Sequence, residues 1–306
     1  MTDTAGSTGT RCGFVALVGA PNAGKSTLMN ALIGGKVSIV SPKVQTTRTR
    51  VTGIIAEGAS QIIFVDTPGI FVPKRRLDRA MVRAAWDGAK DADEVVLLID
   101  ASQGRLDEDS ERIIAGLEKA GRKAVLALNK IDLVKQRDKL LARVQALNER
   151  FPFTRTFMIS ATSGDGIADL RRHLAGEMPE GPWLYPEDEM TDMPLRLLAA
   201  EVTREKLFLN YHQEVPYGLT VETEKWEDFK DGSVKIDQTV YVQRDNHKAI
   251  VLGKGGQAIR RVREQSQSEL EAMMERKVHL FLFVKVRESW DEDPERFKPW
   301  GLEWNA

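Results

Sequence analysis

The chain has 306 residues, of which 42% are hydrophobic, and its formal net charge is −1. This length suggests two domains of ordinary size, and the composition excludes a wholly disordered chain. The near-zero charge excludes nucleic-acid binding over the whole surface, so such a contact must be a local basic patch. Because Cys12 is the single cysteine, an intrachain disulfide is excluded and a cytoplasmic setting is expected. No apolar run approaches the roughly 18 residues of a membrane span, which leaves peripheral membrane contact open.

Residues 1–12 are expected to form a flexible N-terminal tail, and residues 13–176 the first domain. In this domain short, apolar, β-branched runs alternate with helical stretches. Such runs are typical of strands covered on both faces, and their alternation with helices predicts an α/β fold with a doubly wound, mostly parallel sheet. Each run ends in polar or glycine residues, at the sheet edge where such folds bind ligands. The predicted strands are Phe14–Gly19, Gln61–Asp66, Glu94–Asp100, Lys123–Asn129 and Arg155–Ser160.

Residues 177–194 contain four prolines and are predicted to be a linker between domains. Residues 195–290 show a different pattern: an amphipathic helix, two alternating strands, a helical turn, a glycine loop, a long helix to about Met274 and a last alternating strand. The order α-β-β-α-α-β predicts a smaller α+β domain. Residues 291–306 are expected to form a C-terminal tail, which carries Trp300 and Trp304.

A phosphate-binding loop follows the first predicted strand. In GAPNAGKST, Gly19, Gly24, Lys25 and Ser26 match the pattern G-x-x-x-x-G-K-[ST]. Glycines let backbone N–H groups converge on phosphate oxygens, the following helix adds a partial positive charge, and Lys25 adds a full one. The Ser26 hydroxyl is placed to coordinate Mg²⁺. The residues predicted to contact nucleotide here are Gly19, Ala20, Pro21, Asn22, Ala23, Gly24, Lys25, Ser26 and Thr27.

Three further motifs follow in order, each at the end of a predicted strand. In DTPG, Asp66 is expected near Mg²⁺ and the Gly69 N–H near a γ-phosphate. In NKID, Asp132 can accept hydrogen bonds from N1–H and the 2-amino group of guanine, and adenine has neither donor. In SAT, the backbone can contact guanine O6. Together the motifs predict a GTP/GDP site that also contains Asp66, Thr67, Pro68, Gly69, Ile70, Asn129, Lys130, Ile131, Asp132, Ser160, Ala161 and Thr162.

The threonine-rich loop Ser41–Arg50 is predicted to close over the γ-phosphate and Mg²⁺. Thr47 is the expected metal ligand, with Thr46 as the alternative, and Ser26 and Asp66 complete the metal site. The expected reaction is in-line attack of water on the γ-phosphate. The residue after DTPG is Ile70, where small signalling GTPases carry a glutamine that orients this water, so either hydrolysis is slow or another group positions the water. The predicted catalytic residues are Asn22, Lys25, Thr47 and Gly69.

A second glycine-rich stretch, residues 247–263, is basic: it has five Lys or Arg and no Asp or Glu. Gly253, Gly255 and Ala258 fit the loose spacing of a dinucleotide loop, but that loop needs a strand before it, and HKAIV indicates a helical turn. Gly253 and Gly256 instead fit G-x-x-G between two helices, which permits close approach of a sugar-phosphate backbone. The residues predicted to bind single-stranded RNA are Lys248, Ile250, Gly253, Lys254, Gly255, Gly256, Arg260 and Arg261. The apolar residues that form either the floor of an RNA groove or ordinary core are Ile250, Val251, Leu252 and Ile259.

The chain resembles the Era-type GTPases over nearly its whole length. The resemblance is carried by GAPNAGKSTLMNAL, SPKVQTTR, DTPGI, NKID, SATSGDGI, the linker EGPWLYPEDEMTD and AAEVTREKL. It implies a P-loop GTPase domain followed by a type II KH domain. It also implies a factor that binds the 3′ end of 16S ribosomal RNA, assists assembly of the 30S subunit, and acts in the cytoplasm with peripheral association with the inner membrane face. We expect a monomer.

The resemblance also bears on the residue that replaces the missing glutamine. In relatives with an apolar residue after DTPG, an asparagine at the position of Asn22 helps to hold K⁺ in place of an arginine finger, and the alternative is that Asn22 only shapes the loop. A different function is also compatible with the sequence: a GTP-gated membrane-associated or protein-binding scaffold in which turnover is incidental. GTP-dependent binding of RNA that matches the ribosomal 3′ end distinguishes the two functions.

Overall fold

The computed structural model describes residues 9–48, 50–73, 76–136, 138–288, 290, 293, 302 and 303. The chain divides into two compact units. The first contains the described residues up to Ser38 and Thr47–Asp192, and the second contains Ile39–Thr46 and the described residues from Met193 onward. The second unit therefore includes six residues of the threonine-rich loop, Ser41–Thr46, and the two residues before it.

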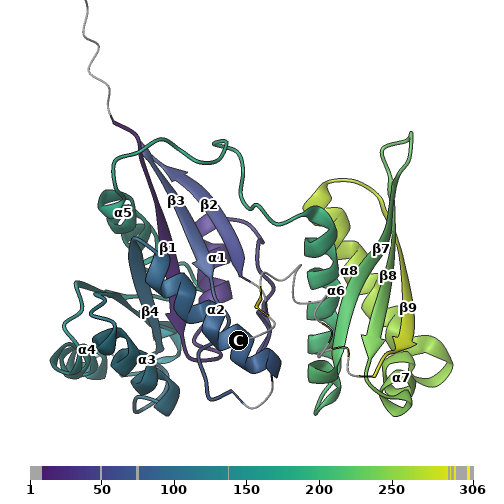
Figure 1. Ribbon diagram of the computed structural model, residues 1–306, viewed down its shortest axis with the longest axis horizontal. Helices are drawn as coiled ribbons and strands as arrows, with labels where there is room; N and C mark the ends of the chain where they lie inside the picture. Colours follow the sequence, from purple (N-terminus) through teal and green to yellow (C-terminus); the bar gives the residue numbers. More distant parts are fainter. Residues whose placement is uncertain are drawn as a thin grey trace, which may run out of the picture. The chain divides into compact units, whose positions relative to one another are not determined.

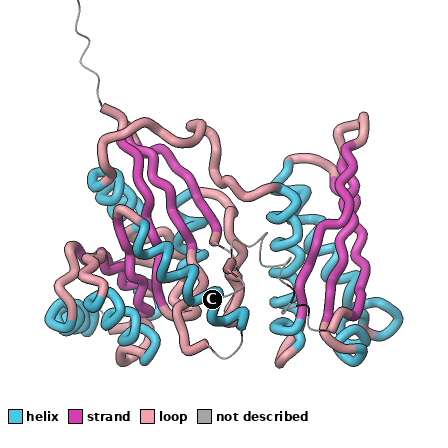
Figure 2. The backbone as a smooth tube through the Cα atoms, in the orientation of Figure 1, coloured by secondary structure: helices cyan, strands magenta, loops and turns pink. Residues whose placement is uncertain are grey.

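The first unit is built on a six-stranded sheet in the order β2-β3-β1-β4-β5-β6 (Figures 1 and 2). All neighbouring strands pair in parallel except β2 and β3, which are antiparallel. The expected doubly wound, mostly parallel sheet is confirmed. The strands are β1 (Arg11–Gly19), β2 (Val51–Glu57), β3 (Ser60–Asp66), β4 (Glu94–Asp100), β5 (Val125–Asn129) and β6 (Arg155–Met158). The helices are α1 (Lys25–Ile33), α2 (Arg76–Asp91), α3 (Glu108–Lys119), α4 (Asp138–Arg150) and α5 (Ile167–Glu177).

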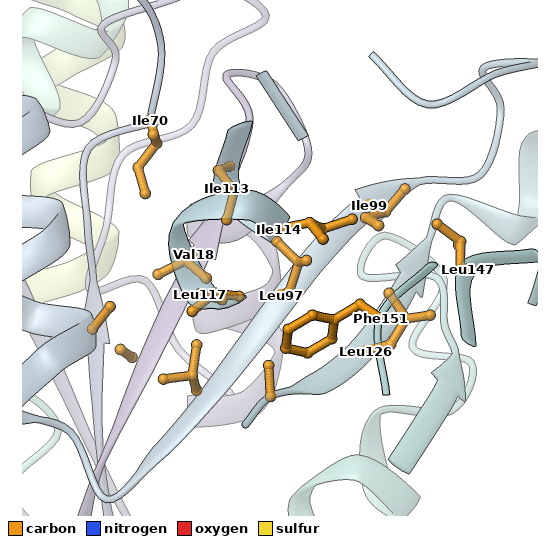
Figure 3. Close-up of a cluster of buried hydrophobic side chains, with 14 of the residues drawn as sticks. Val18, Ile70, Leu97, Ile99, Ile113, Ile114, Leu117, Leu126, Leu147 and Phe151 are labelled. Carbon is orange, nitrogen blue, oxygen red and sulfur yellow. The ribbon is translucent and has the colours of Figure 1, made fainter. Parts of the chain in front are cut away.

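Both faces of this sheet are covered, which explains why its central strands are apolar throughout. One buried cluster joins side chains of α2, α3 and α4 to the sheet (Figure 3). Along β1, Ala16 and Val18 belong to this cluster, whereas Val15 and Leu17 alternate with them and are also fully buried. Because successive strand residues point to opposite faces, the second face is covered too. Helices α1 and α5 contact each other and β3.

The antiparallel edge strand β2 was not among the predicted strands. The proline-rich stretch, which was predicted to be a linker, runs beside this strand. The Ile54 N–H donates to the Met190 carbonyl at 2.9 Å, and the Thr191 hydroxyl donates to the Thr52 carbonyl at 2.6 Å. These bonds occupy part of an edge that would otherwise present unpaired backbone groups.

The second unit has the predicted order α-β-β-α-α-β. Its three-stranded sheet runs β7-β8-β9, with β7 antiparallel and β9 parallel to β8. Helices α6 and α8 pack together, and their apolar side chains share two buried clusters with the sheet. The long helix α8 ends at Met274, as predicted. The elements are α6 (Leu195–Asn210), β7 (Leu219–Asp228), β8 (Val234–Val242), α7 (Asp245–Leu252), α8 (Gln257–Met274) and β9 (Val278–Val286).

The segment after β9 contains a core residue. The Trp290 side chain is fully buried, and its indole Nε1–H donates to the Gly218 carbonyl at 3.0 Å. Trp300 and Trp304 lie outside the described residues. Among the described residues, no helix combines the length and apolar character needed to cross a bilayer.

Candidate nucleotide site and glycine loop

The phosphate-binding motif occupies the loop between β1 and α1. β1 ends at Gly19 and α1 begins at Lys25, so the first N–H groups of a helix open onto this loop. Gly24 has φ 100°, and a Cβ placed on it would lie 2.4 Å from Asn129 Nδ2. Only glycine fits at this position, because any other residue would be strained and would displace the Asn129 amide.

Lys25 is held inside the loop. Its ammonium donates to the carbonyls of Gly19 at 2.9 Å and Ala20 at 3.0 Å, and its side chain is buried. Burial lowers the pKa of Lys25 to about 8, against the opposing effect of the Asp66 charge, which raises it. The motif thus places one desolvated cation at the start of α1, where the first N–H groups of a helix lack intrahelical partners, and this combination suits a polyphosphate.

Three oxygen-bearing side chains meet beside this lysine. The Ser26 hydroxyl donates to Asp66 Oδ2 at 2.6 Å and lies 2.8 Å from the Thr47 hydroxyl, which is itself 3.5 Å from Asp66 Oδ2. Ser38 also donates to this carboxylate oxygen, at 3.0 Å. Burial raises the pKa of Asp66, while these hydroxyls and the Lys25 charge lower it. The other oxygen, Asp66 Oδ1, is buried and has no hydrogen-bond partner among the described residues.

This donor set fits Mg²⁺. Hydroxyl and carboxylate oxygens are the hard ligands that Mg²⁺ prefers, and Asp66 has an acceptor that the protein leaves unused. The two adjacent threonines differ in surroundings. The Thr47 hydroxyl lies beside Ser26, whereas the Thr46 hydroxyl donates to the Lys43 carbonyl at 2.6 Å and lies 2.5 Å from the Ser41 hydroxyl.

Asn129 joins two loops of the site. Its side-chain Nδ2 donates to the Ala23 carbonyl at 2.9 Å, and its Oδ1 accepts from the Ala161 N–H at 3.0 Å. Asn129 is 2% exposed, so both bonds are shielded from water. The side chain therefore fixes the distance between the phosphate loop and the SAT loop, although the two lie more than a hundred residues apart in sequence.

Lys130 makes a second connection to the phosphate loop. Its ammonium donates to the Asn22 carbonyl at 2.7 Å and forms an ion pair of 2.7 Å with Asp100. Asp100 was not predicted as a site residue. Its position at the end of a predicted strand, like that of the other site residues, could have indicated it. Asp132, two residues after Lys130, has an exposed side chain.

Ile70 is buried, 4% exposed, in the cluster shown in Figure 3. Its N–H donates to the Gly19 carbonyl at 3.4 Å, and a Cβ on Gly69 would lie 3.1 Å from Pro21 Cα. The DTPG segment therefore packs against the phosphate loop. Because its side chain belongs to the core, Ile70 has no means of orienting water.

The other predicted nucleotide-site residues differ in burial. Thr67 is buried and its hydroxyl donates to the Leu17 carbonyl at 2.9 Å. Asn22 has an exposed side chain and φ 63°, in the left-handed region. Ala20, Ala23, Pro68, Ser160 and Ala161 are buried, Pro21, Thr27 and Ile131 are half-buried, and Thr162 is exposed.

In the second unit, the predicted RNA loop connects α7 to α8. Gly253, Gly255 and Gly256 have φ of 69°, 59° and 77°, and a Cβ on Gly253 would lie 2.6 Å from Ala258 Cβ. The backbone path alone therefore favours glycine. Lys254, Gly255, Arg260 and Arg261 are exposed, Ile250 is 50% exposed, and Lys248, Gly253 and Gly256 are half-buried.

Two findings modify the predicted groove. Val251 is fully buried in the core of the second unit, so it cannot serve as the floor of an exposed groove. A hollow of about 360 Å³ lies between α8 and β9, and it includes Ile259 and Arg260. His279 and Phe281 of β9 also line this hollow; they lie two residues apart on one face of the strand, and no motif in the sequence indicated them.

Comparisons with known proteins agree with these sites. Residues 14–130 match the family described as 50S ribosome-binding GTPase, and residues 214–291 match the KH domain family. GTPase Era of Afipia carboxidovorans is 60% identical over 294 residues, covering 96% of this chain and 95% of that protein. GTPase Era of Rhizobium meliloti is 58% identical over 308 residues, covering 99% and 98%.

The chain belongs to the Era GTPase family. It accordingly binds GTP and GDP and hydrolyses GTP. The structure agrees: an Aquifex aeolicus Era variant bound to GDP and AlF4⁻ is 37% identical, with a TM-score of 0.89 over 95% of this chain and 99% of that one. Another solved Era, also 37% identical, has a TM-score of 0.90 over the same shares and was determined in complex with MgGDPNP and nucleotides 1506–1542 of 16S ribosomal RNA. The Era fold is a P-loop GTPase domain followed by a KH domain, as the sequence predicted.

Proposed function

We propose that this chain is a GTP-dependent factor that binds the 3′ end region of 16S ribosomal RNA and assists assembly of the 30S subunit. The observation that carries the proposal is the Era complex with 16S nucleotides and MgGDPNP, which this chain matches over 95% of its length. We assign the GTPase domain to residues 13–176, the linker to 177–194 and the RNA-binding KH domain to 195–290, with tails at 1–12 and 291–306. The first boundary needs a correction, because Arg11 and Cys12 pair with β3 as the first residues of β1 and so belong to the GTPase domain.

The family description for residues 14–130 names the 50S subunit, whereas the complex contains small-subunit RNA. That family match ends at residue 130 and the KH match begins at residue 214, so the first carries no information on the KH domain. We favour the small subunit because the RNA in that Era complex is 16S ribosomal RNA. The setting is then the cytoplasm, where subunits assemble; peripheral membrane contact stays a prediction.

The proposed RNA surface is the glycine loop and the first turns of α8. Lys254, Arg260 and Arg261 are exposed and supply charge for phosphates, and the positive-φ glycines, which have no side chains, allow a sugar-phosphate chain to approach the loop closely. Ile250, which is half exposed, and the hollow beside Ile259 offer apolar surface for unstacked bases.

The test is a charge reversal of Lys254 and Arg260 to Glu. We expect this variant to lose binding of a short RNA that matches the 16S 3′ end, in the presence of GDPNP, with GTP affinity unchanged. The matched control reverses Lys230 and Lys277, two exposed lysines near the other end of the same sheet. RNA binding by the reversed variant would show that these two residues are not the RNA contact. No binding of this RNA by the native chain, with GTP binding retained, would instead support a GTP-gated membrane-associated or protein-binding scaffold.

In the nucleotide site, we propose that Lys25 binds the outer phosphates and that Ser26, Thr47 and Asp66 hold Mg²⁺. The metal supplies charge stabilisation for the transferred phosphoryl group when it is bound. The protein's own groups orient the substrate: the loop amides and the Gly69 N–H face the phosphates, and the Asp132 carboxylate selects guanine. The position of the Thr47 hydroxyl beside Ser26 supports Thr47 over Thr46.

We propose that Asn22 takes part in K⁺-dependent hydrolysis. Ile70 is in the core, so the water-orienting role falls to another group, and the exposed Asn22 side chain lies in the phosphate loop. We expect GTP hydrolysis to be faster in K⁺ than in Na⁺, and Asn22→Ala to remove the difference. Equal rates of the native chain in both salts would refute the role.

A further inference from the structure

The loop that follows β4, residues 100–103, is held by an arginine of α4. One guanidinium nitrogen of Arg143, Nη2, donates to the Asp100 carbonyl at 3.0 Å. The other, Nη1, donates to the Ala101 carbonyl at 2.9 Å and to the Gln103 carbonyl. Because a guanidinium is planar and rigid, three bonds from it to one short loop leave that loop little freedom.

The Asp100 carboxylate connects this loop to Lys130. Asp100 is 8% exposed, and its Oδ1 accepts from the N–H and the hydroxyl of Ser102 at 2.8 and 2.6 Å. Its Oδ2 forms the 2.7 Å ion pair with the Lys130 ammonium. Burial acts to raise the pKa of Asp100, but the hydrogen bonds from Lys130 and Ser102 outweigh it and hold the pKa below its ordinary value. The carboxylate is therefore ionised at neutral pH, and the pair is charged.

The Lys130 ammonium joins this carboxylate to a strained part of the phosphate loop. It also donates to the Asn22 carbonyl at 2.7 Å. Asn22 and Lys130 have φ of 63° and 65°, in the left-handed region that residues other than glycine rarely adopt. Such conformations persist only where the surrounding contacts hold them. The ion pair is a contact of this kind, because it fixes the ammonium that binds the Asn22 carbonyl.

We propose that Asp100 and Arg143 are positioning residues for the binding of guanine nucleotide. Arg143 fixes the loop after β4, Asp100 in that loop holds the Lys130 ammonium, and the ammonium keeps the phosphate loop in the shape that binds nucleotide. All of these contacts lie within the first unit. The inference rests on the proposed nucleotide site, in which Lys25 binds the outer phosphates. It extends that site to α4, a helix that carries none of the four nucleotide motifs.

The primary test is Asp100→Asn in the full chain. Asparagine keeps the size of the side chain and an acceptor for Ser102, but it removes the charge that holds Lys130. The nucleotide must then order the phosphate loop itself, so we expect GDP to dissociate roughly tenfold faster. Displacement of a fluorescent GDP analogue by excess GDP in a stopped-flow instrument, with Mg²⁺ present, measures the rate. A native rate would overturn the proposal.

The matched control is Glu57→Gln, which removes an ion pair of the same length from the same unit. Glu57 is the last residue of β2 and binds the Arg171 guanidinium at 2.7 Å. It pairs with Ser60 at the start of β3, whereas Asp100 lies at the end of β4, so the two ion pairs are at opposite ends of the strands. Glu57→Gln should release GDP at the native rate. Equal acceleration in both variants would show that the effect is not specific to Asp100, and the inference would fail.

Arg143→Met tests the first contact of the series. Loss of the guanidinium frees the loop that carries Asp100, so we expect GDP to dissociate at least about threefold faster. The matched control is Arg150→Met, because Arg150 lies later on the same helix and binds the carboxylates of Glu111 and Glu118, at 3.3 and 2.6 Å. This control should have the native rate. The same rate in both arginine variants would contradict the role of Arg143.

Combined variants separate positioning from general destabilisation. If Asp100 acts through Lys130, Asp100→Asn should not speed dissociation further when Lys130→Met is already present, because residues that act as a unit are not additive. For the same reason, Arg143→Met should add nothing to Asp100→Asn. Effects that multiply in either pair would refute the proposed series of contacts.

Two further variants keep the outcome interpretable. If Arg143→Met does not fold, Arg143→Lys replaces it; a single ammonium cannot span three carbonyls, so dissociation should still be at least about twofold faster, and a native rate would count against the proposal. Lys25→Met tests the underlying site. Native GDP affinity in Lys25→Met would show that the proposed nucleotide site is wrong, and the inference would fail with it. Lost affinity there, together with native rates in Asp100→Asn and Arg143→Met, would refute the inference alone.

Discussion

Replacing Asn129 by alanine is expected to disconnect the phosphate loop from the SAT loop. The substitution removes the donor to the Ala23 carbonyl and the acceptor of the Ala161 N–H, two bonds of 2.9 and 3.0 Å around a side chain that is 2% exposed. Each buried backbone group left without a partner costs about 1–3 kcal/mol, so the assembled site loses about 2–6 kcal/mol.

Much of this cost should appear as lost nucleotide affinity. In the free variant the two loops can move apart and their backbone groups can bind water, and nucleotide binding must then bring them back together. Because about 1.4 kcal/mol corresponds to a factor of ten, we expect GDP affinity to fall at least roughly tenfold. Equilibrium titration with a fluorescent GDP analogue measures the affinity, and urea unfolding measures any change in stability.

Two further variants sharpen the test. Asn129→Asp keeps an acceptor for the Ala161 N–H but turns a carboxylate toward the Ala23 carbonyl, so it should bind GDP as poorly as the alanine variant. Asn148→Ala makes the same chemical change at an exposed asparagine of α4, whose amide donates to the Val144 carbonyl, and should have native affinity. Native GDP affinity in Asn129→Ala would refute the reasoning, whatever happened to stability.

Three other predictions concern stability and pH. Gly24→Ala should abolish GDP binding, because its φ is 100° and the new Cβ would lie 2.4 Å from Asn129 Nδ2; titration with fluorescent GDP tests this. Lys25 has its pKa lowered from 10.5 to about 8, so between these values the unfolded chain binds more protons and the nucleotide-free protein gains stability as pH rises. The free energy of unfolding, measured with urea across that pH range, should rise by a few kcal/mol in the native chain. The rise should be absent from Lys25→Met. Trp290→Phe should lower the free energy of unfolding by about 1–3 kcal/mol, because the Gly218 carbonyl loses a buried donor.

Matched controls separate these effects from general strain. Gly34→Ala has a similar backbone strain, with φ 79°, but no atom within 4 Å of the new Cβ, so it should lose stability and keep GDP affinity. Trp183→Phe removes an exposed indole bond of 3.1 Å to the Ala59 carbonyl and should change unfolding little. Loss of GDP binding in Gly34→Ala, a full pH gain in Lys25→Met, or equal losses in both tryptophan variants would each contradict the corresponding prediction.

Several features could be predicted because they depend on residues near one another in the chain. The turn after β1 requires glycine at position 24, and the helix that follows begins at Lys25. The short motif therefore predicted the phosphate loop and its position at the edge of the sheet. The glycine loop before α8 was predictable for the same reason, since it lies between two helical stretches with exposed basic residues. Alternating apolar runs likewise predicted the central strands and the order α-β-β-α-α-β.

Other features follow from contacts between distant parts of the chain. The edge strand β2 escaped prediction, and the Met190 carbonyl binds its Ile54 N–H although the two lie far apart in the sequence. The sequence pattern does not distinguish Thr46 from Thr47 as a metal ligand. The tertiary structure does, because the Thr47 hydroxyl lies beside Ser26 whereas the Thr46 hydroxyl donates to the Lys43 carbonyl.

The sequence by itself determined the phosphate loop, the NKID and SAT motifs and the glycine loop, because each is a run of a few residues with its own backbone requirements. Only the tertiary structure decided how these pieces are held. Asn129 reaches Ala23 across 106 positions and Lys130 reaches the Asn22 carbonyl across 108. Such bonds form only where folding has already excluded water and fixed both partners, so no local pattern records them.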